Sequence, residues 1–292
     1  MVPSSSPTNS WLEQSRAFAH LFRLPVAILA ALAGCTTVYA LNSAMALDRY
    51  LLAGIVLACM YSAACAINDY WDLDKDRINH ADRPLPSGRL SLAQARRAAI
   101  ALFTTAAIAA LHLGLYPFLL VAMVIPLLWH YSQILAYSGI LGNAIVAAVI
   151  AALILFGGLV AHRPFAMVYS TGFLFVYQWA KEIIWDVHDA KGDRDRGVTT
   201  IANRWGDRTA FGIAWGAIAT LMASIPSALF LLPMARPLWF AVFAGAMLLS
   251  LAIALIRYQL HRSAIAYDSF IIWERLGMLF GIIGLLGTAP PS

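Results

Sequence analysis

The chain has 292 residues, of which 61% are hydrophobic and 12% are charged, and its mean hydropathy is +0.73. Soluble globular domains are about half apolar and about a quarter charged, so this composition excludes an ordinary water-soluble enzyme and indicates a polytopic membrane protein. The formal net charge of +5 is explained by basic residues in the loops on one side of the membrane. We therefore expect no nucleic-acid partner.

Crossing about 30 Å of hydrocarbon takes about 20 mostly apolar residues per helix. A window of that length gives nine candidate segments, at residues 25–45, 49–68, 98–114, 115–131, 142–161, 165–184, 209–232, 238–256 and 268–287. We therefore predict an all-helical membrane protein with about nine transmembrane helices. The polar start lacks the apolar core of a signal peptide. Residues 1–24 are thus predicted to form a cytoplasmic tail, and residues 25–292 the transmembrane domain.

Lys and Arg residues are distributed unevenly between the two predicted sides. With nine spans and the N-terminus inside, fifteen of them lie inside, three lie outside, and Lys181 and Arg275 fall within spans. Cytoplasmic loops carry such an excess of positive charge. We expect an integral protein of a bacterial inner or plasma membrane.

Ten of the fifteen acidic residues gather in two loops, each after an apolar segment on the predicted cytoplasmic side. The first group is Asp69, Asp72, Asp74, Asp76 and Asp82, and the second is Asp186, Asp189, Asp193, Asp195 and Asp207. Ordinary solvated loops are the alternative interpretation, but two separate acidic groups with interleaved basic residues favour a binding site.

The spacing within each group predicts a cation site. Asn68, Asp72 and Asp76 step by four, and the later trio Asp186, Asp189 and Asp193 steps by three and then four. On a helix that continues past the membrane, each trio forms one stripe. Like charges at this spacing repel each other, so a cation is expected between them.

The side-chain types narrow the choice of ligand. Oxygen donors without histidine or thiolate favour Mg²⁺, Mn²⁺ or Ca²⁺, and Mg²⁺ often completes its shell with phosphate oxygens. Interleaved basic side chains suit contacts to the same phosphates; they are Arg77, Arg83, Lys191, Arg194 and Arg196. Because the cavity walls available in such a bundle are apolar, the other half of the ligand should be a hydrocarbon chain.

At these residues the sequence resembles the UbiA superfamily of intramembrane prenyltransferases. The two motifs are NDYWDLDKD, from Asn68 to Asp76, and DVHDAKGD, from Asp186 to Asp193; the flanking runs DRINHADRPLPSGRLS and KEII are similar too. The resemblance implies a helical bundle around a central cavity that opens laterally to lipid and is capped by the motif loops. It also implies Mg²⁺ as the cofactor and an isoprenyl diphosphate as a substrate.

The resemblance assigns roles to individual residues. It implies that Asp72, Asp76, Asp189 and Asp193 are catalytic and that these four arrange Mg²⁺ together with Asn68 and Asp186. It implies diphosphate contacts for the basic residues at or near family positions, namely Arg77, Arg83, Lys181 and Arg194. We add Lys191 to these predicted diphosphate ligands because it lies within the second acidic group.

The acceptor site departs from the family pattern. The stretch YSQILAYSGILGNAIVAAVIAALILFGGLV is similar to the branch of digeranylgeranylglyceryl phosphate synthases and chlorophyll synthases. Ala136, Tyr137 and Trp185 stand where relatives that handle polar acceptors often carry charges. A carboxylate-bearing aromatic acceptor is therefore disfavoured, and a small, weakly polar acceptor is expected.

Three functional classes stay open on the sequence. Prenyl transfer to such an acceptor is the leading hypothesis, a terpene cyclase without external acceptor is the alternative, and a transporter or lipid-binding protein is the third. His188 is either a general base on an acceptor hydroxyl or a hydrogen-bonded loop histidine.

Overall fold

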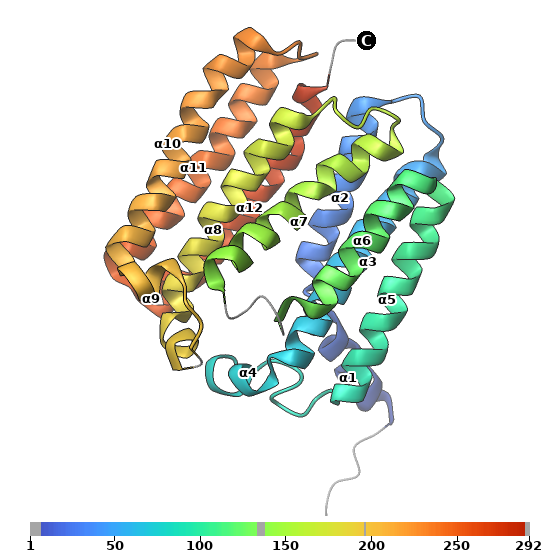
Figure 1. Cartoon of the computed structure of the whole chain (residues 1–292). Helices are drawn as coiled ribbons and strands as arrows, with labels where there is room; N and C mark the ends of the chain where they lie inside the picture. Colours follow the sequence, from blue (N-terminus) through green and yellow to red (C-terminus); the bar gives the residue numbers. More distant parts are fainter. Residues whose placement is uncertain (1–6, 133–137, 196, 290–292) are drawn as a thin grey trace, which may run out of the picture.

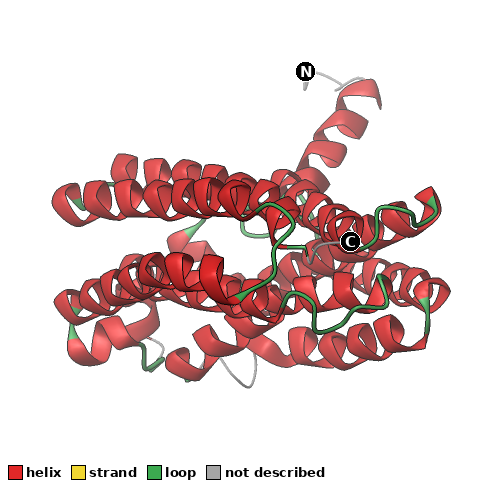
Figure 2. Cartoon of the chain, turned by 90° about the horizontal axis from the view of Figure 1, so that it is seen from above, coloured by secondary structure: helices red, strands yellow, loops and turns green. Residues whose placement is uncertain are grey.

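The computed structural model describes residues 7–132, 138–195 and 197–289. The helices within these ranges are α1 (Pro7–Leu21), α2 (Leu24–Leu41), α3 (Leu47–Trp71), α4 (Leu73–Asn79), α5 (Leu92–Leu113), α6 (Leu115–His130), α7 (Gly139–Val160), α8 (Val168–Asp195), α9 (Ile201–Trp205), α10 (Asp207–Leu231), α11 (Pro237–His261) and α12 (Ala264–Thr288). This part of the chain forms no strand, apart from an isolated bridge between Ser138 and Thr199 (Figure 2). The all-helical prediction is confirmed.

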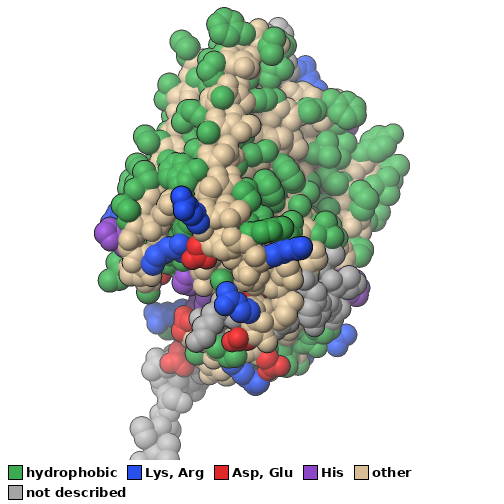
Figure 3. All heavy atoms as spheres, turned by 60° about the vertical axis from the view of Figure 1, so that its left-hand side comes forward, with side chains coloured by type: hydrophobic (Ala, Val, Ile, Leu, Met, Phe, Trp, Pro, Cys, Tyr) green, Lys and Arg blue, Asp and Glu red, His purple; other side chains and the backbone are tan. Residues whose placement is uncertain are grey.

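Most of the long helices have the length and composition of membrane spans. Seven described helices qualify, namely α2, α3, α5, α7, α10, α11 and α12. Figure 3 shows charged side chains gathered toward one end of the visible face, while hydrophobic side chains cover the rest. A surface of this kind is stable only in contact with lipid, so the chain is an integral membrane protein.

The predicted count of nine spans depends on α6 and α8, and it stays a prediction. Helix α6 has 16 residues, which gives a length of about 24 Å against about 30 Å of hydrocarbon. Helix α8 has 28 residues, but it carries Lys181 and Glu182, which lower its hydropathy. Both of these side chains are buried inside the bundle, so they do not face lipid.

The packing is organised around two hydrophobic clusters. One lies mainly on α3, α5 and α6 and the other on α8, α10, α11 and α12. Helices α2 and α7 contact each other, and α2 also contacts α3 and α12. At Gly157 on α7 an added Cβ would come within 2.5 Å of Thr37 Cγ2 on α2, so glycine permits the close approach of these helices.

The two motif segments reach the same end of the bundle, where α4 and α9 lie (Figure 1). Helix α8 continues to Asp195, so the second trio lies on one helix as predicted. The prediction of one continuous helix through the first trio is wrong at Asp72, whose φ of −95° and ψ of 15° separate α3 from α4. Asp72 joins two helices, but its N–H bonds to the Asn68 carbonyl and its carbonyl accepts from the Asp76 N–H, so the i, i+4 spacing of the trio persists across the bend.

The two helices that follow the motif segments, α5 and α9, each begin with a capping box. Ser91 and Gln94 exchange side-chain and backbone hydrogen bonds at the start of α5, and Thr200 and Asn203 do so at the start of α9. Such reciprocal bonds satisfy helix N–H groups that otherwise lack partners. They fix where the chain enters each helix after a motif.

Candidate active site

A cavity of about 790 Å³ lies between the helices, and its residues come from α1–α4, α6–α8, α11 and α12. At one end it is lined by side chains of both motifs, including Asn68, Asp72, Asp76 and Asp189. Farther in, apolar side chains such as Leu153 and Ile282 form the walls. The cavity therefore offers a charged mouth and an apolar interior to one elongated ligand.

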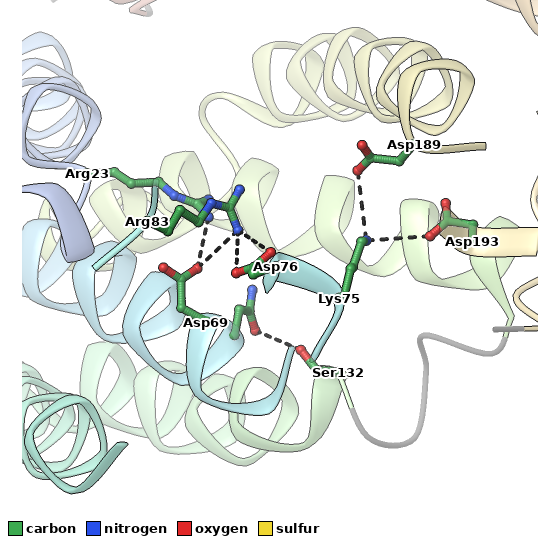
Figure 4. A network of polar contacts seen from close by, with 9 residues as sticks. Arg23, Asp69, Lys75, Asp76, Arg83, Ser132, Asp189 and Asp193 are labelled. Atoms are coloured by element: carbon green, nitrogen blue, oxygen red, sulfur yellow. Dashed lines mark hydrogen bonds and ion pairs between the residues drawn. The ribbon is translucent and has the colours of Figure 1, made fainter. Parts of the chain in front are cut away.

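The first motif is held by a chain of ion pairs between buried carboxylates and partly exposed arginines (Figure 4). Arg83 Nη1 lies 2.8 Å from both carboxylate oxygens of Asp76 and 3.5 Å from Asp69 Oδ1. Arg23 Nη2, at the junction of α1 and α2, lies 3.2 Å from the same Asp69 oxygen. Buried carboxylates require such partners. The pairs tie the loop after α4 to α3 and to the start of α2.

Lys75 connects the two motifs directly. Its Nζ lies 3.8 Å from Asp189 Oδ2 and 3.5 Å from Asp193 Oδ1, which places a cation from α4 against two carboxylates of α8 (Figure 4). Lys75 thus balances part of the negative charge of the second motif. Arg23 and Lys75 were not among the predicted site residues. Arg23 lies far from both motifs in the sequence, and Lys75 lies inside the first motif but outside its i, i+4 spacing.

Several predicted site residues have other neighbours. Arg77 is exposed and pairs with Asp74 at 2.9 Å. Asp186 Oδ2 accepts a hydrogen bond of 2.7 Å from Asn143 Nδ2 on α7 and is not among the cavity-lining residues. Arg194 is exposed and does not line the cavity either. The side chain of Lys191 and the residues Ala136 and Tyr137 lie outside the described part of the chain.

Asn68 and His80 complete the polar end of the cavity. Asn68 Oδ1 accepts a hydrogen bond of 3.2 Å from Ser132 Oγ, just after α6. Burial lowers the pKa of His80, and the nearby Arg83 guanidinium acts in the same direction. His80 is therefore neutral at neutral pH, and it adds a hydrogen-bonding ring without further positive charge.

A second polar layer lies deeper in the cavity on α8 and α12. Lys181 Nζ lies 2.7 Å from Glu274 Oε1 and 4.6 Å from the centre of the Trp185 ring. Glu182 accepts a hydrogen bond from the Gln178 amide. Lys181 is eight residues from Asp189, which is about 12 Å along the helix axis. The predicted diphosphate ligand Lys181 is therefore paired with a carboxylate below the motif layer.

The donor set at the mouth has the character of a shared metal site. Within the described ranges, no three His, Cys, Asp or Glu side chains lie close enough to hold one metal ion. Mg²⁺ commonly takes one or two carboxylates and completes its shell with water and substrate phosphates. The oxygens of Asn68, Asp72, Asp76 and Asp189 around one cavity fit Mg²⁺ shared with a phosphate ligand.

Residues 27–279 match the model of the UbiA prenyltransferase family. The chain belongs to this family. The resemblance stated from the two motifs is thus confirmed, and the family match includes both motifs and the deeper polar layer.

Sequence relatives in this family include archaeal enzymes. The chain is 33% identical to the digeranylgeranylglyceryl phosphate synthase of Sulfolobus acidocaldarius over 183 residues, which are 62% of this chain and 66% of that protein, slightly under two thirds of its length. It is 32% identical to the synthase of the same name from Korarchaeum cryptofilum over 250 residues, which are 84% of this chain and 88% of that protein.

A solved structure has the same fold. A UbiA homologue from Archaeoglobus fulgidus, described as bound to GPP and Mg²⁺, has a TM-score of 0.71 with this chain at 18% sequence identity; the match covers 92% of this chain and 99% of that one. At this level of identity the likeness shows the fold alone. The ligands belong to the homologue.

Proposed function

We propose that this chain is a Mg²⁺-dependent membrane prenyltransferase that ionises an isoprenyl diphosphate and transfers the prenyl group to a small, weakly polar acceptor. One observation carries the proposal: Asn68, Asp72, Asp76 and Asp189 line the mouth of the cavity whose inner walls are apolar. A diphosphate suits the mouth and a hydrocarbon chain suits the interior. The GPP and Mg²⁺ of the Archaeoglobus homologue support the same pairing.

When bound, Mg²⁺ supplies positive charge that stabilises the departing diphosphate. Ion pairs within the protein hold in position the side chains that surround this charge. Arg83 keeps Asp76 in place through two contacts of 2.8 Å, and Lys75 approaches Asp189 and Asp193 from the opposite motif. A phosphate entering the mouth would exchange some of these internal ion pairs for contacts of its own.

The acceptor we propose is an alcohol without a carboxylate. The named relatives are synthases of digeranylgeranylglyceryl phosphate, so geranylgeranylglyceryl phosphate is the first acceptor to test, although its charged phosphate makes it more polar than the acceptor expected from the sequence. We further propose that the motif loops face the cytoplasm, on the basis of the charge asymmetry, and that residues 1–24 precede a single domain at 25–292. The bacterial source stays a prediction, and the relatives named above are archaeal.

The test uses the purified protein in detergent or nanodiscs with geranylgeranyl diphosphate, with and without geranylgeranylglyceryl phosphate, and identifies products by mass spectrometry. We expect a prenyl ether that requires both the acceptor and Mg²⁺. EDTA should abolish its formation and added Mg²⁺ should restore it. A cyclic hydrocarbon formed without acceptor would replace transfer with cyclisation, and binding without any diphosphate release would leave a lipid-binding protein.

A further inference from the structure

Glu182 is a buried carboxylate inside the cavity that has no cationic partner among the described side chains. It is 9% exposed, it lines the cavity, and its Oε1 accepts a hydrogen bond from the Gln178 amide. The neighbouring Lys181 is engaged by Glu274 at 2.7 Å. A buried charge without a counter-ion is costly, and ionisable groups at membrane depth generally serve a function.

The depth of Glu182 in the cavity places it near the carbon that would react. Glu182 precedes Asp189 by seven residues on α8, which is about 10 Å along the axis. Asp189 belongs to the mouth that suits the diphosphate, and the prenyl chain runs inward from it toward the apolar walls. The carbon that bears the diphosphate therefore lies between the levels of Asp189 and Glu182. A nucleophile that attacks this carbon from the interior passes close to the Glu182 carboxylate.

We propose that Glu182 is the general base that removes the hydroxyl proton of an alcohol acceptor, an inference that rests on the proposed function. The bond between the prenyl carbon and the diphosphate oxygen breaks, and its electron pair leaves with the diphosphate. The acceptor oxygen forms the new bond to that carbon with a lone pair. Its proton passes to the Glu182 carboxylate and is released to water after the product leaves.

Gln178 is a positioning residue in this arrangement. Its amide nitrogen donates to Glu182, while its carbonyl oxygen is buried and has no hydrogen-bond partner within the described residues. The amide group is thus committed to orienting one carboxylate oxygen, and the other oxygen is available to the acceptor. Because both residues lie on α8 one turn apart, the helix itself fixes their relative position.

The other candidate bases are less suited to this step. His188 is exposed, stacks on Tyr267 with ring centres 3.5 Å apart, and is not among the cavity-lining residues. Glu274 lines the cavity, but its charge is neutralised by Lys181. Asp186 is bonded to Asn143 and lies outside the lining. Asp268 also lines the cavity, but it is exposed near the start of α12. Glu182 is a buried carboxylate that lines the cavity and forms no ion pair among the described residues.

The experiment separates ionisation of the diphosphate from proton removal. Glu182→Gln, Glu182→Asp and the control Asp195→Asn are compared with the wild type in three assays. These are diphosphate release from geranylgeranyl diphosphate without acceptor, transfer to geranylgeranylglyceryl phosphate, and transfer to its thiol analogue at a pH above the pKa of the thiol. Asp195 is exposed on the same helix, so its variant reports general effects of losing a charge on α8.

We expect Glu182→Gln to release diphosphate at the wild-type rate, to transfer to the alcohol at least about 100-fold more slowly, and to transfer to the thiolate normally. Glu182→Asp should recover part of the transfer to the alcohol. Equal losses with alcohol and thiolate, loss of diphosphate release, or unchanged transfer to the alcohol would each overturn the role of Glu182. If the wild type releases no diphosphate even with both acceptor and Mg²⁺ present, the proposed function fails instead.

Discussion

Asp72 and Asp189 are the residues at which the two motifs expose oxygen ligands to the same cavity. We predict that Asp72→Ala or Asp189→Ala abolishes product formation, because each removes a ligand or a charge next to the departing diphosphate. Neither side chain belongs to the hydrophobic clusters. Expression and membrane insertion should therefore be unchanged, as measured by matched protein levels after detergent extraction.

The matched control for this prediction is Asp195→Ala, since Asp195 is exposed at the end of the same helix as Asp189 and is not among the cavity-lining residues. It should keep wild-type activity. Full turnover in both motif variants would remove the argument for a metal-bridged diphosphate. Loss of activity in all three variants would instead indicate a general dependence on negative charge at this end of the bundle.

The Lys181–Glu274 pair supports a prediction about stability. Both side chains are almost fully buried, so removing one partner leaves the other charge unpaired. Lys181→Met or Glu274→Met should each destabilise the fold by about 3–5 kcal/mol, whereas the double variant Lys181→Met/Glu274→Met should recover most of that loss. Thermal unfolding in detergent, followed by circular dichroism, measures the difference. Additive losses in the double variant would show that the two groups do not act as a pair.

The spacing of the acidic residues predicted which part of the site would form, but it could not identify every contact. Asp72, Asp76 and Asp189 line the cavity as the stripes suggested. Asp186 belongs to the same trio, yet it bonds to Asn143 on α7. Periodicity within one helix defines a face of that helix, whereas the neighbour that meets this face depends on tertiary packing.

At the scale of elements, Gly157 predicts how tightly α7 and α2 pack. An added Cβ would lie 2.5 Å from Thr37 Cγ2 and 2.7 Å from Thr37 Cβ, so Gly157→Ala requires the helices to move apart. We expect a destabilisation of about 1–3 kcal/mol. Gly172 on α8 has nothing within 4 Å of the added Cβ, and Gly172→Ala should be neutral or stabilising because alanine favours helix.

The same thermal unfolding assay compares the two glycine variants. Equal stability of Gly157→Ala and Gly172→Ala would contradict the close approach of α7 and α2. A lower stability of Gly157→Ala with normal binding of prenyl diphosphate would show that this contact supports the bundle without shaping the cavity mouth.

Helix positions were predictable because apolar length is a strong local signal. The segment expected at 115–131 corresponds to α6 at Leu115–His130, and the one at 209–232 to α10 at Asp207–Leu231. Helix α8 continues beyond the apolar span at 165–184 to Asp195, as the spacing of the second trio predicted. The break at Asp72 could not be foreseen, because the first motif contains no proline or glycine to mark it.

At the scale of the whole molecule, the sequence gives the helices and their order but not the shape of the space between them. The cavity is lined by residues from most of the chain, from His20 to Thr288. Its polar mouth was predictable because motif residues are concentrated in sequence. The deeper layer, in which Lys181 on α8 pairs with Glu274 on α12, was not, because it depends on how two helices distant in the sequence are placed side by side.

The number of spans and their orientation lead to a final prediction. With nine spans, Asp74 and Asp195 lie on the side of the motif loops, and Arg163, between α7 and α8, lies on the opposite side. Figure 1 shows the connection between α7 and α8 at the end of the bundle opposite α4. If α6 and α8 did not cross the membrane, Arg163 would instead lie on the same side as Asp74 and Asp195.

Single cysteines at these three exposed positions distinguish the two topologies, after replacement of the native residues Cys35, Cys59 and Cys65, which are free thiols. With the positive-inside orientation, an impermeant maleimide should label Arg163→Cys in intact cells, and should label Asp74→Cys and Asp195→Cys only in inverted vesicles. Labelling of Arg163→Cys only from the inner side would reduce the count to seven spans. Labelling of all three with the opposite sidedness would keep nine spans but reverse the orientation, and it would place the motif loops outside the cytoplasm.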